Sequence, residues 1–312
     1  MTLLHDIVVH TGMSGVDLLR IIETAPLRYK QYPIPKRSGG TRLIAQPSRE
    51  LKLLQRFVAQ HILEKLPVHK AAMAYVQGRN ILNNARVHSS NPVILKLDFE
   101  NFFHSIKVAD FIYYFKRKNI PSIPVEDMKV MVNILFWGRG EKKADCLSIG
   151  APTSPLISNI ILFEIDKMLF NEATKKGIEY TRYADDITVS GPSISEVIDF
   201  EKFIRGTISK VQSPDLKFNE KKRGVYTKGM RRLVTGLVLT PDGSVSIGRE
   251  RKRAISSLIH KFSHGELSEK DTKYLNGMLG FAIANEPEFI GRMRNKYGND
   301  LIEQIQKIVA SL

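Results

Sequence analysis

The 312-residue sequence predicts an α+β fold, in which short antiparallel strands alternate with helices and the C-terminal part is helical. Residues 180–191, YTRYADDITVSG, place β-branched and aromatic residues on both sides of an acidic pair, which is typical of a tight hairpin. Residues 93–98 form a nearly continuous apolar run, which is typical of a strand buried on both faces. From Arg249 onward the sequence predicts only helices, over about 249–262, 268–285 and 287–312.

The composition indicates a globular protein with an anionic partner. Hydrophobic residues make up 43% of the chain, which is enough for a sizeable core, and 47 Lys and Arg against 32 Asp and Glu give a formal net charge of +15. This excess predicts nucleic acid as the partner first and an anionic membrane second. No apolar run approaches the roughly 18 residues of a membrane span, and the N-terminus lacks the features of a signal peptide. We therefore expect a cytoplasmic protein.

The acidic hairpin tip is the strongest chemical signal in the chain. Burying Asp185 and Asp186 side by side costs several kcal/mol unless a cation lies between them. Because Cys146 is the only cysteine, a metal ion would have to be held by oxygen ligands, as hard divalent cations prefer. Asp98, at the exit of the predicted buried strand, supplies a third carboxylate. The alternative is an ordinary solvated turn, in which Asp-Asp is common.

The N-terminal third predicts helices and a basic flap. Two short helices are expected within residues 1–30, and a longer amphipathic helix over about 50–66. Between them, two strands enclose a glycine turn and project Lys36, Arg37 and Arg42. These cations could clamp a triphosphate, and an ordinary solvated hairpin is an equally good explanation.

Three further segments carry candidate functional residues. Asn84 and His88 lie one helical turn apart and so share a face, although a lone histidine on a helix is more often structural. The sequence Gly150-Ala151-Pro152 would let a backbone approach a ligand closely. Residues 217–232 hold seven basic residues and one acid, interleaved with aromatic residues, and predict nucleic-acid contact over a merely solvated charge run. Residues 233–248 predict a hairpin that turns at 242–243.

The order of these motifs resembles that of reverse transcriptases, and its details resemble the bacterial retron branch. LDFENFF at 97–103 resembles the motif of the first metal aspartate, GAPTSP at 150–155 the motif beneath the incoming nucleotide, and YADD at 183–186 the two-aspartate hairpin. Asn84-Ala85 with His88 resembles the NAxxH element of retron enzymes, and Val234-Thr235-Gly236 resembles their VTG element. One position departs from the pattern, because Ile149 stands where many relatives have a glutamine whose amide could hydrogen-bond the nucleotide.

The resemblance implies a right-hand polymerase fold with fingers, a palm of antiparallel sheet plus helices, and a small helical thumb. On this basis residues 1–92 are expected to form N-terminal helices and fingers. Residues 93–248 are expected to form the palm, with inserted fingers helices at about 107–147 and a hairpin like a primer grip. Residues 249–312 are then the thumb, which binds RNA.

The resemblance also implies two-metal phosphoryl transfer with two Mg2+ ions. The expected catalytic residues are Asp98, Asp185, Asp186 and, as a proton donor to pyrophosphate, Lys222; the expected metal ligands are the three aspartates and the Phe99 carbonyl. Phe103 is expected to exclude a ribose 2'-OH, with Phe102 as the second choice. The expected nucleotide-binding residues are Lys36, Arg42, Phe102, Phe103, Ile149, Gly150 and Ala151. The expected RNA-binding residues are Asn84, His88, Val234, Thr235, Gly236, Arg249, Arg251, Lys252 and Arg253.

The implied biology is that of a retron. The enzyme would use dNTPs to reverse transcribe a cognate noncoding RNA, self-primed from a guanosine 2'-OH, and so make branched RNA–DNA (msDNA). Such systems act in anti-phage defence with a toxic effector, which here would be a separate protein. The alternatives are a group II intron-like or diversity-generating reverse transcriptase, a non-catalytic RNA-binding module on a polymerase fold, and a basic membrane-surface protein. A non-catalytic module predicts the loss of a metal aspartate, and all three are present.

Overall fold

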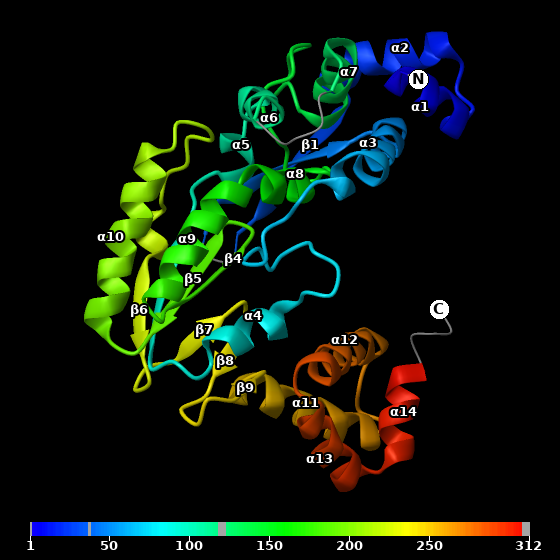
Figure 1. The fold of residues 1–312 in the computed structure, drawn as a ribbon. Coiled ribbons are helices and arrows are strands. Elements are labelled where there is room, and N and C mark those ends of the chain that lie inside the picture. Colours follow the sequence, from blue (N-terminus) through cyan, green and yellow to red (C-terminus); the bar gives the residue numbers. More distant parts are fainter. Residues whose placement is uncertain (1, 37–38, 118–122, 308–312) are drawn as a thin grey trace.

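The computed structural model describes residues 2–36, 39–117 and 123–307, and its centre is a four-stranded antiparallel sheet (Figure 1). The strands are β3 (Val93–Asp98), β4 (Glu179–Tyr183), β5 (Asp186–Gly191) and β6 (Gly224–Thr227), in the order β4-β5-β3-β6. Both the 180–191 hairpin and the strand ending at Asp98 are as the sequence predicts. The register pairs Asp98 with Asp186, so two of the three acidic residues lie side by side on neighbouring strands.

The two faces of this sheet have different partners. Residues 187, 189 and 191 of β5 face helices α9 (Phe163–Lys175) and α10 (Ile194–Lys210), which lie along the sheet in Figure 1. Residues 186, 188 and 190 point to the opposite face, where α4 (Ile81–His88) packs at the end far from the acidic tip. The tip itself is therefore left open on this second face.

The N-terminal elements confirm the predicted helices and flap. They are α1 (Leu3–Thr11), α2 (Gly15–Thr24), η1 (Ala25–Leu27), β1 (Tyr29–Pro35), β2 (Thr41–Pro47) and α3 (Arg49–His61). β1 and β2 pair as an antiparallel ribbon whose tip holds Lys36 and Arg42, while Arg37 lies outside the described residues. The helix predicted to reach residue 66 ends at His61 and continues as the 3-10 turn η2 (Leu63–Lys65).

Short helices connect these elements to the sheet. They are α5 (Phe102–Ser105), α6 (Val108–Phe115), α7 (Val125–Leu135), α8 (Ser154–Ile161) and the 3-10 turn η3 (Glu220–Lys222). Pro155 stands at the start of α8, where the backbone N–H that proline lacks has no helical partner.

The C-terminal part joins a small sheet to a helical bundle. β7 (Arg232–Val234), β8 (Leu237–Leu239) and β9 (Val245–Ser246) precede α11 (Arg249–Ser263), α12 (Glu269–Asn285), α13 (Pro287–Tyr297) and α14 (Asn299–Lys307). The prediction of a single helix over 287–312 is wrong, because Gly298 at φ 91° separates α13 from α14. The turn at 242–243 is confirmed, and the sequence prediction missed a second turn at 235–236. None of the described helices has the length and apolarity that a membrane crossing requires.

Two separate hydrophobic clusters support this arrangement. The larger one joins α1, α2, the flap and the helices on the covered face of the sheet. The second one joins the C-terminal helices and the β7–β9 sheet to Leu82 and Ala85 of α4 and to Ile94 of β3. Helix α4 is thus the element through which the C-terminal bundle is packed onto the central sheet.

A fully buried ion pair lies under the hairpin. Arg182 of β4 and Asp166 of α9 have no exposed side-chain surface, and the Arg182 Nη2 atom lies 2.6 Å from the Asp166 Oδ2 atom. The Tyr180 hydroxyl donates to the same carboxylate at 2.9 Å. Two charges buried together are stable only because each satisfies the other, so neither can be removed alone without a large cost.

We predict that Arg182→Met lowers the free energy of unfolding by about 3–5 kcal/mol, because it leaves Asp166 as an uncompensated buried charge. Adding Asp166→Leu and Tyr180→Phe to the same chain should recover most of this loss, since the unpaired buried carboxylate and the hydroxyl that donates to it are then removed. Urea denaturation of the single and triple variants measures both values. A single variant as stable as the wild type, or a triple variant weaker than the single one, would contradict the importance of the pair.

Candidate active site

The catalytic candidates meet at one edge of the central sheet. Asp98 ends β3, Asp186 begins β5 opposite it, and Asp185 forms the hairpin tip. The backbone N–H of Phe99 donates to the Asp185 carbonyl at 3.0 Å, which ties the β3 exit to the tip. Ala184 has φ 58°, and its carbonyl accepts a hydrogen bond from Arg182 Nη1 at 3.0 Å. The buried guanidinium therefore fixes the backbone of the turn that carries the acids.

Two lysines balance the charge of these acids. Lys222 Nζ lies 2.8 Å from both carboxylate oxygens of Asp98, and Lys96 Nζ lies 2.9 Å from Asp186 Oδ2. Among the described residues, Asp185 forms no ion pair. Lys96 is absent from the residues predicted from sequence. Its position two residues before Asp98 on one strand is the signal that could have found it, because alternate residues of a strand share a face.

Burial and repulsion raise the pKa of the two tip carboxyls. For Asp185, burial raises the pKa first and the charge of Asp98 raises it further, while Lys222 lowers it. For Asp186, burial also raises the pKa, and the ion pair with Lys96 opposes this effect. A nearby cation would relieve both the burial cost and the repulsion.

The donor set suits a hard divalent cation. Within residues 2–36, 39–117 and 123–307, no three acidic, His or Cys side chains are arranged closely enough to enclose an ion, since Asp98 and Asp186 are turned toward lysines. The three carboxylates nevertheless offer only oxygen ligands, and the mutual repulsion of Asp98 and Asp185 favours a cation between them. These residues therefore fit a divalent metal that displaces Lys96 and Lys222 from the carboxylates.

The loop predicted to lie beneath the nucleotide packs against the flap. Ala45 N of β2 donates to the Ile149 carbonyl at 2.9 Å, and a Cβ atom on Gly150 would lie 3.0 Å from the Ala45 carbonyl oxygen. Gly150 also has φ 125°, which a side chain would strain. The close approach predicted at this glycine is thus made by a protein strand. Ala151 is buried, whereas Ile149 is only partly buried.

The two phenylalanines after Asp98 have different environments. Phe102 is 4% exposed, and its ring stacks on Phe99 with centroids 5.9 Å apart. Phe103 is only partly buried and lies at the margin of the core. The structure therefore corrects the assignment of Phe102 to the nucleotide surface, because its ring is enclosed by protein. Lys36 and Arg42 are exposed on the flap, where they can reach a ligand.

The structure corrects the prediction that Asn84 and His88 contact RNA. Both are fully buried, and His88 bridges Ser190 Oγ at 2.8 Å and Thr181 Oγ1 at 2.7 Å. Burial lowers the pKa of His88 to about 3, so the imidazole is neutral. The structural alternative for this histidine is confirmed: it fastens α4 to the open face of the sheet.

The Val234-Thr235-Gly236 segment is a turn that joins two elements. Thr235 and Gly236 have φ 47° and φ 82°, and Val234 is fully buried, so its predicted contact with RNA is wrong. Thr235 Oγ1 donates to the Ile81 carbonyl of α4 at 3.1 Å, and Arg251 of α11 donates to the Gly236 carbonyl at 2.6 Å. The two motifs that resemble retron elements thus meet in one joint between the sheet and the C-terminal helices.

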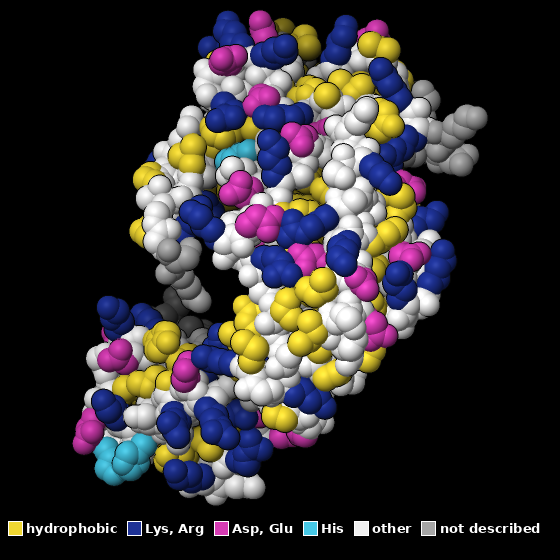
Figure 2. Space-filling model, turned by 90° about the vertical axis from the view of Figure 1, so that its left-hand side faces the viewer, with side chains coloured by type: hydrophobic (Ala, Val, Ile, Leu, Met, Phe, Trp, Pro, Cys, Tyr) yellow, Lys and Arg dark blue, Asp and Glu magenta, His cyan; other side chains and the backbone are white. Residues whose placement is uncertain are grey.

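The basic residues at the start of α11 divide into two groups. The Arg251 guanidinium also lies 5.0 Å from the Phe281 ring centroid, and Lys252 pairs with Glu286 at 2.5 Å, so both act within the protein. Arg249 and Arg253 are exposed and remain candidates for RNA contact. Figure 2 shows Lys and Arg side chains gathered over the lower part of the molecule, where the C-terminal helices lie.

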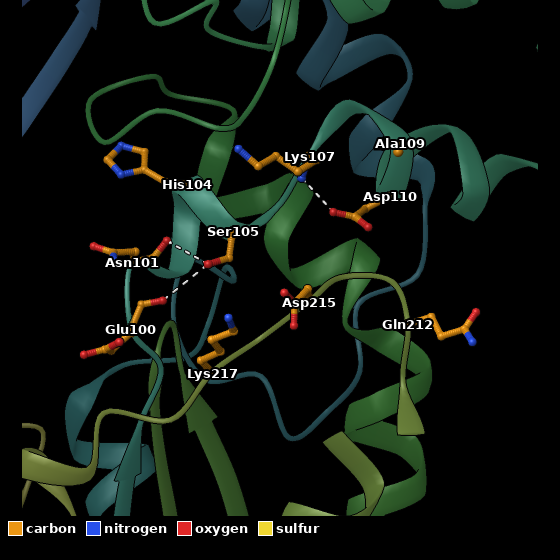
Figure 3. Close-up of a pocket in the computed structure, with 10 residues that line it drawn as sticks. All are labelled: Glu100, Asn101, His104, Ser105, Lys107, Ala109, Asp110, Gln212, Asp215 and Lys217. Carbon is orange, nitrogen blue, oxygen red and sulfur yellow. Dashed lines mark hydrogen bonds between the residues drawn. The ribbon is translucent and has the colours of Figure 1, made fainter. Parts of the chain in front are cut away.

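A separate cavity of about 460 Å³ lies beside the segment that follows Asp98 (Figure 3). It opens between the α5–α6 segment and the 212–217 loop, and the three aspartates are not part of its wall. Its lining carries both charges, and Lys107 N donates to the Asp110 carboxylate at 2.6 Å. The lining residues are Glu100, Asn101, His104, Ser105, Lys107, Ala109, Asp110, Gln212, Asp215 and Lys217.

An acid-tipped hairpin on an antiparallel sheet, backed by helices and facing a cationic flap, is the palm of a nucleic-acid polymerase. Residues 34–275 match the family model described as reverse transcriptase (RNA-dependent DNA polymerase). The chain therefore belongs to the reverse transcriptase family, with the retron enzymes among its relatives, and is an RNA-directed DNA polymerase. This family uses divalent metal ions, an RNA template and dNTP substrates.

Curated relatives cover nearly the whole chain. The Retron Ec83 reverse transcriptase of Escherichia coli is 38% identical, over 89% of this chain and 90% of that protein. The Retron Ec86 reverse transcriptase of Escherichia coli is 32% identical, over 95% and 91%. The Retron Ec73 reverse transcriptase of Escherichia coli is 33% identical, over 87% and 88%.

We predict that Asp185→Asn stabilises the metal-free protein at pH 7, by on the order of 1 kcal/mol. A carboxyl whose pKa is raised on folding opposes folding once the pH is high enough to ionise it, and the amide removes that opposition. The gain should be absent below the ordinary Asp pKa and should grow as the pH rises through the higher pKa of the folded state. Urea denaturation at several pH values, in the presence of a chelator, measures it. A loss of stability at pH 7 would show that the carboxylate supports the fold.

Proposed function

We propose that the enzyme adds dNTPs to a primer hydroxyl with two Mg2+ ions, held by Asp98 and Asp185 with Asp186 nearby and the Phe99 carbonyl as a further ligand. The observation that carries this proposal is the pairing of Asp98 with Asp186 beside the Asp185 tip, on the open face of the sheet. When bound, the two ions activate the primer hydroxyl and neutralise the triphosphate. The chain's own residues hold the ions, bind the triphosphate and donate the proton.

Lys222 and the two flap cations have separate roles in the proposed reaction. Lys222 has its ammonium beside Asp98, so it lies at the reacting end of the site and is the candidate proton donor to pyrophosphate. Lys36 and Arg42, exposed at the flap tip, grip the triphosphate. The Ala45 hydrogen bond joins the flap to the Ile149–Ala151 loop, so a ligand bound by the flap lies close to that loop.

The division of the chain follows from the same assignment. Residues 1–92 form the N-terminal helices and fingers, and residues 93–248 form the palm with inserted helices at about 107–147. Residues 249–312 form the thumb that binds RNA. The β7–β9 sheet shares its hydrophobic cluster with the C-terminal helices, which supports a role in anchoring the thumb to the palm.

We further propose that the template is one cognate structured noncoding RNA and that synthesis begins from a guanosine 2'-OH, giving branched RNA–DNA (msDNA). Support comes from the retron reverse transcriptases that resemble the chain over nearly its full length. In the same proposal the enzyme works in the cytoplasm, in anti-phage defence, beside a separate toxic effector protein. Sequencing the nucleic acid that co-purifies with the protein tests the proposal. One RNA joined to a DNA through a 2' linkage is expected, and a mixture of unrelated RNAs without DNA would contradict it.

We predict that Asp185→Asn with Asp186→Asn reduces DNA synthesis on an annealed primer by at least 1,000-fold, on the order of the loss when charge stabilisation is removed from a transition state. RNA binding and the circular dichroism spectrum should be unchanged, because neither carboxylate is part of the core. Glu179→Gln, an exposed acid at the far end of β4, is the matched control. Synthesis near the wild-type rate in the double variant would rule out the metal assignment.

We predict that Phe103→Ala raises the ratio of ribonucleotide to deoxyribonucleotide incorporation by about 10-fold or more, because the specificity rests on steric exclusion of the 2'-OH. Single-nucleotide extension with paired rNTP and dNTP measures the ratio. Phe102→Leu is the control, and it should change stability and leave the ratio unchanged, since Phe102 is enclosed in the core. A ratio that moves with Phe102 alone would place the discrimination elsewhere.

We predict that Arg249→Ala with Arg253→Ala weakens RNA binding and lowers the slope of log K against log salt by up to about 1.5, because two phosphate contacts are lost. Lys175→Ala with Lys202→Ala removes the same charge from α9 and α10, where both side chains are exposed. Fluorescence anisotropy at several salt concentrations compares the two pairs. Equal slopes for both double variants would mean that α11 makes no specific contribution.

A further inference from the structure

A short segment before α4 lies along the outer edge of the catalytic hairpin. Arg182 N donates to the Ala71 carbonyl at 2.8 Å and Met73 N donates to the Arg182 carbonyl at 2.7 Å, so Ala72 and Arg182 form a parallel bridge. The segment thus lies against β4, the edge strand of the sheet, through this single bridge. The bridge is parallel, so the chain after Ala72 and the chain after Arg182 leave it in the same direction, and Arg182 is followed three residues later by Asp185 at the tip.

The segment is pinned firmly up to the residue before Tyr75. Asn159 of α8 donates to the Ala74 carbonyl at 2.9 Å, and Arg79 donates to the Ala72 carbonyl at 2.6 Å. The alanines and Met73 are buried, whereas Tyr75 is 57% exposed. The fixed backbone thus places the large aromatic ring of Tyr75 in solvent, near the edge of the sheet that carries the acids.

The backbone of Tyr75 is in a region that tyrosine rarely adopts. Its φ is 59°, which costs a residue other than glycine about 1–3 kcal/mol. Such strain persists where the surrounding structure enforces it, and an exposed ring gains little from burial in return. The free energy of folding therefore gives no reason for a tyrosine at this position.

The groups around the Tyr75 hydroxyl belong to the active site. Although much of the side chain is exposed, partial desolvation by the surrounding protein raises the pKa of Tyr75, the charges of Tyr183 and Asp185 raise it further, and Arg42 lowers it. Tyr75 thus lies on the outer side of β4, within range of charges at the hairpin tip and on the flap. A neutral aromatic ring at that place offers a flat apolar face to a ligand whose phosphates and metal ions are held by its neighbours.

We propose that Tyr75 is a stacking residue, whose ring supports a nucleobase of the template–primer at the point where the hairpin acts. Stacking is the chemistry that an exposed ring can offer to any of the bases, so it suits a template of mixed sequence. The base is either the templating base or the base at the primer terminus. The inference rests on the proposed use of the hairpin tip, and its test is one of binding, so that it does not depend on synthesis.

The test is a double-mutant cycle that combines Tyr75→Asn in the protein with an abasic site in the nucleic acid and compares the dissociation constants. Asparagine accepts the left-handed backbone but has no ring, so it removes stacking without adding strain. The dissociation constant of an annealed template–primer should rise about tenfold in this variant, within the range of a single stacked base. With an abasic site at the stacked position the variant and the wild type should bind alike, while an abasic site at the other position should leave the tenfold difference.

Two further measurements separate stacking from a structural role. Tyr75→Phe should bind within about twofold of the wild type, and Tyr75→Asn should have an equal or higher melting temperature because the strain is relieved. The same tenfold loss with every abasic substrate, or an unchanged dissociation constant in Tyr75→Asn, would overturn the proposal. So would a fall in melting temperature accompanied by the same loss in Tyr75→Phe. Binding that follows the prediction in an enzyme without Mg2+-dependent synthesis would instead refute the proposed catalytic function alone.

Discussion

The structure of the site depends on one buried guanidinium. Arg182 pairs with Asp166 of α9, and it donates to the Ala184 carbonyl in the hairpin turn. Its own backbone N–H and carbonyl bind the segment that leads to Tyr75. The α9 helix, the hairpin and the segment before Tyr75 are therefore joined at a residue whose side chain has no exposed surface. A buried ion pair adds little net stability, but it allows only one arrangement of its partners, and here that arrangement places the acids at the edge of the sheet.

The second constraint is the like charge that this arrangement creates. Asp98, Asp185 and Asp186 are brought together by backbone pairing, so their repulsion is built into the register of the sheet. Lys96 and Lys222 compensate part of it, and both come from neighbouring strands or turns of the same sheet. Each lysine thus balances the charge of one acid without closing the site. A divalent ion competes for Asp98 with a single ammonium that stands half exposed to water.

The sequence predicted those parts of the fold that local chemistry determines. The hairpin, the strand ending at Asp98, the flap and the helix starts follow from periodicity and from turn residues. What it missed depends on contacts between distant segments. In the sequence nothing sets Lys96 apart from the other basic residues, because its partner Asp186 lies on β5, far from it along the chain. Asn84, His88 and Val234 were expected on a surface, because a motif gives spacing and residue type but says nothing about burial. Tyr75 carried no signal, since the local sequence marks neither its left-handed backbone nor the bridge that brings its segment to β4.

The central claim is that Asp98 and the hairpin tip act as one metal-dependent centre for DNA synthesis on RNA. The most direct measurement is the rate of single-nucleotide addition to a DNA primer on an RNA template, as Mg2+ is titrated into chelated enzyme. The account predicts no addition without metal and a rate that rises more steeply than in proportion to Mg2+ at low concentration. It also predicts that Asp98→Asn abolishes addition at every concentration. Addition by Asp98→Asn at the wild-type rate, or addition without divalent metal, would contradict the account.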